Sequence, residues 1–293
     1  MPELPEVETI RLGLKKAIVG KTIAGVEIRV TKLFHGNKDE IINKKIVDVN
    51  RRAKQIIIDV EGDNDLLIHL KMTGQLIFHG KDFKANSSKL TANSFQAGGH
   101  PSKDWFDNLP NTTTHIIFDF SDGSKLFFND MRKFGWIKIF NSKELKGKLS
   151  DELGIEPFDK EFTSARLAEI IKSKPRWNIK KVLTDQTLIS GIGNIYADEA
   201  LFWAKILPTR LAKVITDDEI LKLQSSIIKA LEIGLKYGGS SENTYVKIDG
   251  SRGKAQEHFQ VYSREGKQCS CGGKVKKIRL NGRGTHFCPA CQS

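Results

Sequence analysis

Short apolar segments repeat between residues 26 and 140, and this repetition constrains the fold more than any other feature of the chain. Residues 26–30 alternate apolar and polar side chains, which is typical of a half-buried strand. Similar runs follow at close intervals, at 46–49, 55–60, 66–70, 75–78, 115–120, 125–128 and 134–140. Residues 121–124, Ser-Asp-Gly-Ser, form a hairpin signal between two of these runs. The pattern predicts an antiparallel sandwich or barrel.

One helical pattern precedes the strands, from residue 5 to residue 20. The apolar residues that recur there at helical spacing are Val7, Ile10, Leu14 and Ile18. Gly20 is a suitable stop for that helix. A helix followed by a long run of strands predicts an N-terminal domain of class α+β, which we assign to residues 2–140.

Loops and helices follow the strands. Residues 80–114 are polar with little periodicity, and we interpret them as a long mobile loop without an element of its own. Residues 141–160 are predicted to be a linker, and 161–239 a helical domain. Within that domain, residues 216–219 form a capping box that opens an amphipathic helix. Polar, glycine-containing residues 240–258 are predicted to be a second flexible loop.

The charge balance indicates a polyanionic partner. The 293 residues include 47 Lys and Arg against 35 Asp and Glu, a formal net charge of +12. An excess of this size favours nucleic acid, although a merely soluble basic protein has the same composition. No run of about 18 apolar residues is present, so we expect no membrane helix. The acidic start lacks an apolar signal core, which favours a cytoplasmic protein.

The first residues of the chain offer an unusual nucleophile. Methionine before proline is normally removed, which would make Pro2 a terminal secondary amine. An α-amino group titrates near pH ~8, so a useful fraction is neutral near pH 7 and can attack an electrophilic sugar carbon. The product is an iminium, an electron sink for later eliminations. Glu3 is the adjacent acid/base candidate. The same residues also suit a plain helix start, with Pro5 in the first turn.

The last 35 residues, 259–293, carry every cysteine of the chain. Cys269 and Cys271 form a C-x-C pair, and Cys288 and Cys291 an ordinary C-x-x-C zinc half-site. Clustered cysteines in a cytosolic protein indicate metal more often than disulfides. We therefore predict one structural zinc per chain, with four reduced thiols on a partly ordered tail as the alternative.

Seven motifs carry a specific family resemblance. They are MPELPEVET at 1–9, RRAK at 51–54, HLKMTG at 69–74, DMRKFG at 130–135, SGIGNIYADEALF at 190–202, QVYSREG at 260–266 and GRGTHFCPACQ at 282–292. With these motifs, in this order, the chain resembles the bacterial formamidopyrimidine-DNA glycosylases. Leu4 stands where the related endonuclease VIII group usually has glycine, which favours the branch acting on purine lesions.

The resemblance implies catalytic roles at matching positions. Pro2 would be the nucleophile at the sugar C1′ and Glu3 its acid/base partner, while Lys54 would assist catalysis and contact phosphate. Arg283 would contact phosphate from the metal hairpin and help the final elimination.

The resemblance also implies DNA contacts. Met72, Arg132 and Phe134 match the wedge that fills the hole left when a lesion leaves the stack. Without the resemblance, Met72 and Phe134 would be predicted to lie in the core. The remaining residues at DNA-gripping positions are His69, His115, Lys180 and Asn194.

The implied fold is an N-terminal helix with a β-sandwich, a helix–two-turn–helix domain and a C-terminal zinc-finger hairpin. The implied protein is a bacterial, nucleoid-associated monomer. It would act on double-stranded DNA with an oxidised base or an abasic site, as a bifunctional DNA glycosylase and AP lyase that excises 8-oxoguanine and formamidopyrimidines. The alternatives are a glycosylase for oxidised pyrimidines and a non-catalytic binder of damaged DNA.

The chain departs from the family pattern at several points. Thr113 stands where many relatives have histidine, and the first cysteine pair has one intervening residue instead of two. The loop at 80–114 is longer than usual. The loop at 240–258 lies where the family covers the flipped base, but its residues do not identify a lesion.

Overall fold

The structure is a computed structural model of the chain, and it describes residues 1–81, 94–97, 109–240 and 253–293. The chain forms two compact units. Unit 1 comprises Met1–Leu149 and Tyr237–Lys254, and unit 2 comprises Ser150–Lys236 and Ala255–Ser293. No helix among the described residues is both long and apolar enough to cross a membrane.

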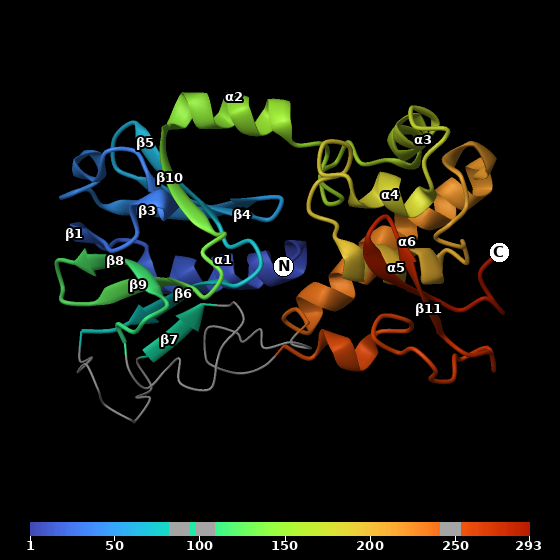
Figure 1. The fold of residues 1–293 in the computed structure, drawn as a ribbon. Coiled ribbons are helices and arrows are strands. Elements are labelled where there is room, and N and C mark those ends of the chain that lie inside the picture. Colours follow the sequence, from blue (N-terminus) through green and yellow to red (C-terminus); the bar gives the residue numbers. More distant parts are fainter. Residues whose placement is uncertain (82–93, 98–108, 241–252) are drawn as a thin grey trace. The chain divides into compact units, whose positions relative to one another are not determined.

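Unit 1 is the predicted β-sandwich (Figure 1). One sheet has the strand order β1-β8-β9-β6-β7, with bounds Ile23–Ile28, Thr114–Phe120, Lys125–Asp130, Gly74–His79 and Ser94–Ala97. The other has the order β2-β10-β5-β4-β3, with bounds Phe34–His35, Trp136–Asn141, Asn64–His69, Gln55–Val60 and Ile46–Arg52. Short 3-10 turns flank β2, at Thr31–Leu33 and Lys38–Glu40.

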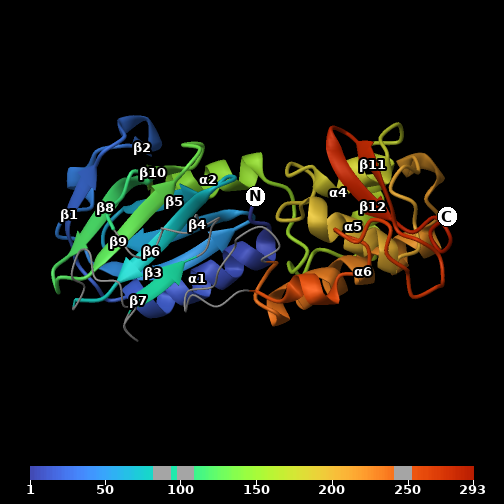
Figure 2. The ribbon, with the colours of Figure 1, turned by 60° about the horizontal axis from the view of Figure 1, so that its bottom comes forward.

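The predicted helix is α1, Leu4–Ile18. It packs against β3 and β4 of one sheet and against β7 of the other (Figure 2). Its apolar face joins side chains from both sheets in one core cluster, which includes Ile10, Leu14, Ile58, Phe118 and Phe128. Because this core fixes the start of the helix, it also fixes the residues that precede Leu4.

Two segments differ from the expectations. Strand β7 lies inside residues 80–114, which were predicted to hold no element; it pairs antiparallel with β6 in the register Leu76 to Ala97. The rest of residues 82–108 lies outside the described part. Helix α2, Ser142–Glu152, occupies the first half of the predicted linker, where only Leu145 and Leu149 are buried.

Unit 2 is helical, as predicted. Its helices are α3 Ser164–Lys172, α4 Ile179–Thr184, α5 Asn194–Trp203 and α6 Asp217–Lys236, with 3-10 turns at Ala212–Val214 and Ala255–His258. The predicted capping box is formed: Thr216 N–H donates to Glu219 at 2.9 Å, and Glu219 N–H donates to Thr216 Oγ1 at 3.3 Å. Helix α6 then runs to Lys236, before Gly238 and Gly239 with positive φ.

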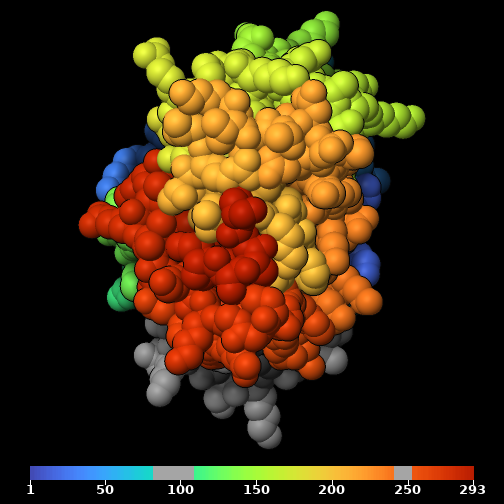
Figure 3. Space-filling model, turned by 90° about the vertical axis from the view of Figure 1, so that its right-hand side faces the viewer, coloured from blue at the N-terminus to red at the C-terminus, as the bar shows by residue number. Residues whose placement is uncertain are grey.

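The chain closes with a hairpin packed on the helices of unit 2. Strands β11, Lys276–Leu280, and β12, Arg283–Phe287, pair antiparallel. Asn281 (φ +50°) and Gly282 (φ +75°) form the tight turn between the two strands. Strand β12 contacts α5. Figure 3 shows the face of unit 2 where the C-terminal residues, in red, lie beside the helices, in yellow and orange.

Candidate active site and nucleic-acid interface

The N-terminal residues are held by a capping box. Pro2 is buried and Glu3 is 4% exposed. Glu3 is the N-cap residue of α1, and its side chain accepts from the backbone of Glu6. In return, Glu3 N–H donates to Glu6 Oε2 at 2.9 Å. These contacts hold Glu3, the residue next to Pro2, at the start of α1, and a terminal nucleophile requires such a defined position.

An ion-pair network ties α1 to the turn that carries Lys54. The Glu8 carboxylate accepts from Arg11 at 2.7 Å and from Arg51 at 3.0 Å. Partial burial opposes ionisation of Glu8, but the two guanidinium groups outweigh it and lower its pKa. Arg51 also donates to the carbonyl of Ala53, a residue with φ +52° between β3 and β4. Lys54, 5% exposed, therefore projects from a turn fixed to the first helix.

His69 is a neutral imidazole in this environment. Burial, and then the nearby charges of Lys71 and Lys54, lower its pKa to about 3. Its Nδ1 accepts from Lys71 N–H at 3.0 Å, so the proton of the neutral ring lies on Nε2. A phosphate contact from His69 would accordingly be a neutral N–H donation.

The three predicted wedge residues lie on two loops at one end of the sandwich. Phe134 is 53% exposed, so the alternative that it is a core residue is excluded. Arg132 lies over its ring, with Cζ 4.7 Å from the ring centroid. Met72 is partly buried on the loop between β5 and β6. Thr73 joins the two loops by donating its hydroxyl to Asp130.

His115 lies inside unit 1 rather than on its surface. It is 2% exposed, and its Nε2 donates to the carbonyl of Asp130 at 2.8 Å. In this arrangement the ring supports the loop of Arg132 and Phe134, and a direct contact with DNA stays a prediction.

In unit 2, a buried ion pair brings together the other predicted contacts. Lys180 is 2% exposed and lies 2.6 Å from Asp198, which is fully buried. Lys180 also donates to Thr285 Oγ1 at 2.7 Å, and Asp198 accepts from His286 N–H at 2.8 Å. Both contacts hold β12 against the helices.

Asn194, at the start of α5, holds the same strand. Its side-chain amide donates to the carbonyl of Gly284 at 2.9 Å. Arg283, which directly precedes Gly284, is exposed beside the tight turn. Lys180 and Asn194 thus fix the strand that presents Arg283, while their own contacts with DNA stay predictions.

Glu199 anchors the segment that leads to the hairpin. It is 2% exposed and accepts three backbone N–H groups, from Gln260 at 2.8 Å and from Val261 and Tyr262 at 2.9 Å. Burial raises its pKa to about 7, against the opposing effect of these donors. Helix α5 therefore holds both the approach to the hairpin and the hairpin itself.

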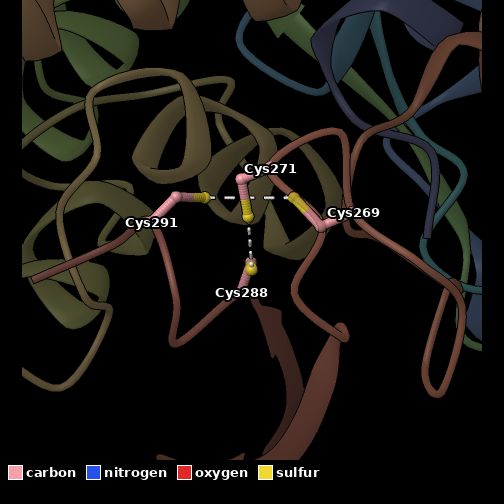
Figure 4. A group of neighbouring side chains, drawn as sticks. All are labelled: Cys269, Cys271, Cys288 and Cys291. Atoms are coloured by element: carbon pink, nitrogen blue, oxygen red, sulfur yellow. Dashed lines mark hydrogen bonds between the residues drawn. The ribbon is translucent and has the colours of Figure 1, made fainter.

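The four cysteines form a cluster suited to zinc (Figure 4). Their Sγ atoms lie within 4.8 Å of one another, with 3.5 Å between Cys271 and Cys288 and 3.9 Å between Cys269 and Cys291. A tetrahedral zinc with Zn–S bonds of about 2.3 Å requires separations of about 3.8 Å. All four cysteines are free of disulfides. The donor set and spacing fit the metal.

The short C-x-C pair is accommodated by two glycines. Gly272 has φ +86°, and its N–H donates to the carbonyl of Cys269 at 2.9 Å. A Cβ on Gly273 would lie 3.2 Å from Cys288 Sγ and 3.4 Å from Cys271 Sγ. The same Cβ would lie 2.6 Å from Ala290 Cβ, which is too close for a side chain, and Gly272 has a positive φ, so the tight turn needs glycine at both positions.

Four buried carboxylates with a structural role at this site were not singled out from the sequence: Glu6, Asp130, Asp198 and Glu199. Each lies inside one of the seven motifs that carry the family resemblance. Each also has a partner far away in sequence, and no local spacing pattern reveals such contacts. These partners are Ser240 for Glu6, Thr73 for Asp130, Lys180 for Asp198 and Gln260 for Glu199.

Family models cover most of the chain. Residues 1–137 match the formamidopyrimidine-DNA glycosylase N-terminal domain, and 153–246 match the H2TH domain of the same glycosylases. Residues 270–293 match the zinc finger found in FPG and IleRS, a range that begins one residue after Cys269.

Relatives match over the full length. The formamidopyrimidine-DNA glycosylase of Pelotomaculum thermopropionicum is 39% identical, with 100% of this chain and 99% of that protein covered. That of Carboxydothermus hydrogenoformans is 38% identical, with both chains fully covered. Among solved structures, Lactococcus lactis Fpg in complex with DNA containing an abasic site has a TM-score of 0.84 at 34% identity, over 100% of both chains. A mutant of that protein bound to Fapy-dG DNA has the same TM-score at 35% identity.

Proposed function

The chain belongs to the formamidopyrimidine-DNA glycosylase family, and we propose that it is a bifunctional glycosylase and AP lyase that excises oxidised purines from duplex DNA. The observation that carries the proposal is the held N-terminus: Pro2 and Glu3 are buried at the start of α1, beside a capping box that fixes them. A terminal amine with a fixed position and an adjacent carboxylate is the arrangement that covalent attack on a sugar carbon needs.

The proposed first step is attack by the neutral amine of Pro2, after removal of Met1, on the sugar C1′. The nitrogen lone pair forms the new C–N bond, and the bond from C1′ to the base breaks with its electrons on the base. Glu3 is placed to exchange a proton with the sugar as its ring opens. The resulting iminium acidifies the C2′ proton. Loss of that proton breaks the C3′–O bond, and loss of a second proton from the conjugated product breaks the C5′–O bond.

Unit 2 supplies the proposed grip on the backbone. Arg283 is exposed next to the hairpin turn, on a strand fixed by Lys180 and Asn194. The cysteine cluster would hold a structural zinc, which would keep that hairpin folded. With a net charge of +12 the chain suits a polyanionic duplex.

An incision panel tests the proposal. Duplexes carrying 8-oxoguanine, a formamidopyrimidine, thymine glycol or an abasic site should be cleaved with a preference for the two purine lesions and the abasic site. Preference for thymine glycol would support the oxidised-pyrimidine alternative. Binding to all four duplexes without cleavage would support the non-catalytic alternative.

A further inference from the structure

One buried carboxylate collects the backbone of the loop at 130–135. Asp130 is fully buried. Its Oδ2 accepts the N–H groups of Phe134 at 2.8 Å and Gly135 at 2.6 Å. Its Oδ1 accepts the N–H of Arg132 at 3.1 Å and the hydroxyl of Thr73. Four donors converge on the two oxygens, and hydrogen bonds to a carboxylate are stronger than neutral ones.

Neighbouring contacts fix the path of that loop. The backbone N–H of Asp130 donates to Thr113 at 2.9 Å, and its carbonyl accepts His115 Nε2 at 2.8 Å. Lys133 has φ +55°, a left-handed conformation that this loop imposes on a side-chain residue. A Cβ on Gly135 would lie 2.8 Å from the ring of Phe128, so only glycine fits there without displacement.

Thr73 connects this loop to the one that carries Met72. Its hydroxyl donates to Asp130 and accepts from Arg132 N–H at 3.1 Å. The Thr73 loop is itself closed, because Gly74 N–H donates to the carbonyl of Leu70 at 2.8 Å. A displacement of either loop would therefore break contacts in the other.

We propose that Asp130 and Thr73 are positioning residues that hold Met72, Arg132 and Phe134 as one pre-formed wedge. The proposal rests on the proposed function, since a wedge is useful only to a protein that opens duplex DNA. Phe134 is 53% exposed with Arg132 over its ring, while the Asp130 carboxylate that binds both backbone N–H groups is buried. Holding the three side chains in place before DNA arrives lowers the ordering cost at the moment of base flipping.

The test compares Thr73→Val with Thr73→Ser. Valine has the shape of threonine but lacks its hydroxyl, whereas serine has the hydroxyl. Asp130→Asn is the second variant, and Asp122→Asn is the matched control. Asp122 also organises a turn, by accepting from Ser124 N–H at 3.0 Å, but that turn lies at the opposite end of β9. Single-turnover excision from a paired 8-oxoguanine duplex is measured against strand cleavage at a ready-made abasic site.

Thr73→Val and Asp130→Asn should lose about tenfold in excision, which corresponds to the loss of one or two buried hydrogen bonds, with cleavage at the abasic site unchanged. Thr73→Ser and Asp122→Asn should keep the wild-type ratio of the two rates. Amide hydrogen exchange at Arg132, Phe134 and Gly135 should accelerate only in the first two variants.

Equal losses on both substrates in Thr73→Val would overturn the proposal, because the two residues would then support only the fold. Faster amide exchange with an unchanged ratio of rates would also overturn it and would leave the proposed function standing. Wild-type protein that cleaves none of the oxidised-base duplexes would instead overturn the proposed function, and the role of the wedge with it.

Discussion

The backbone N–H of Ser240 donates to Oε1 of Glu6 at 2.8 Å, which joins residues 234 positions apart. The other oxygen of Glu6 accepts Glu3 N–H at 2.9 Å. Glu6 is 3% exposed and Ser240 8%. One carboxylate therefore holds the start of the first helix and also the first residue of the segment 240–258, which we expect to cover the flipped base.

Glu6→Gln should weaken both contacts. A glutamine amide has one acceptor oxygen, and its NH2 group would face an N–H donor, so one hydrogen bond is lost and one donor is left buried without a partner. The free energy of unfolding should fall by about 1–3 kcal/mol. Urea unfolding measures this loss, and amide exchange at Ser240 and Glu3 should show which contact is lost. Glu27→Gln, at an exposed position, is the control and should change neither.

Pro2 should be the residue that forms a covalent adduct. Borohydride reduces an iminium to a stable amine, so wild-type protein should be trapped on DNA with an abasic site, and peptide mapping should place the link at the terminal proline. Protein that retains Met1 has an amide nitrogen at Pro2, which is not nucleophilic, and should not be trapped. An adduct that maps to Lys54 would contradict the assignment.

The sandwich and the helices could be predicted because their signals are local. Alternating strands, a capping box at Thr216 and an Asn281-Gly282 turn each depend on residues close in sequence. Strand β7 was not predicted because Ser94–Ala97 is only four residues long and lies within the polar segment 80–114; its backbone pairs with β6.

The candidate site was only partly predictable for a related reason. Phe134 and Arg283 are exposed, which leaves their predicted contacts with DNA open to test. Lys180 and His115 are both 2% exposed. Lys180 forms an ion pair with Asp198, and His115 donates to the carbonyl of Asp130. A motif gives the position of a polar residue, but burial and partner choice depend on tertiary packing.

Glu199 should make the stability of unit 2 fall as pH rises. Burial raises its pKa to about 7 from 4.5, so between these values the folded chain binds more protons than the unfolded chain. Its contribution is therefore present below pH ~4.5 and lost as pH rises through ~7, by at most about 3 kcal/mol.

Glutamine cannot ionise, so Glu199→Gln removes this pH-dependent contribution to the free energy of unfolding. Urea unfolding of both proteins is monitored by tryptophan fluorescence from pH 4.5 to 8. The free energy of unfolding of the wild type, relative to that of the variant, should decrease as pH rises. An advantage that grows with pH would mean that the three N–H donors outweigh burial and keep the carboxylate charged.

Lys180 and Arg283 should affect DNA binding differently. Arg283 is exposed, so Arg283→Ala should reduce the salt dependence of DNA affinity by about one unit of slope at unchanged stability. Lys180→Met leaves Asp198 buried without its ion-pair partner and should cost about 3–5 kcal/mol of unfolding free energy.

The double variant Lys180→Met/Asp198→Asn distinguishes direct from indirect contact, because it removes the uncompensated charge. We expect it to recover stability, and a wild-type salt slope in this variant would show that Lys180 only positions the hairpin. A slope still reduced by about one unit would show that Lys180 contacts a phosphate itself.

The cysteine cluster should bind about one zinc per chain in protein purified without added metal, because its four thiols match a tetrahedral site. Cys288→Ser should lose the metal and DNA binding together, whereas Arg283→Ala should keep the metal. Full activity in chelator-stripped protein would contradict a structural role.

Lys205 is not a metal ligand, but its charge should stabilise the zinc site. Its Nζ lies 3.7 Å from Cys291 Sγ, and four thiolates around Zn2+ leave a net charge of about −2 that a nearby ammonium offsets. Lys205→Met should release zinc to a chromophoric chelator about tenfold more readily, and Lys205→Arg, which keeps the charge, should release it at a rate close to wild type. Because the backbone of Lys205 also binds Ser293 N–H at 3.0 Å, thermal unfolding of the zinc-loaded variants is the control for a lost C-terminal contact. Equal release from the methionine and arginine variants would show that packing at this position, rather than charge, retains the metal.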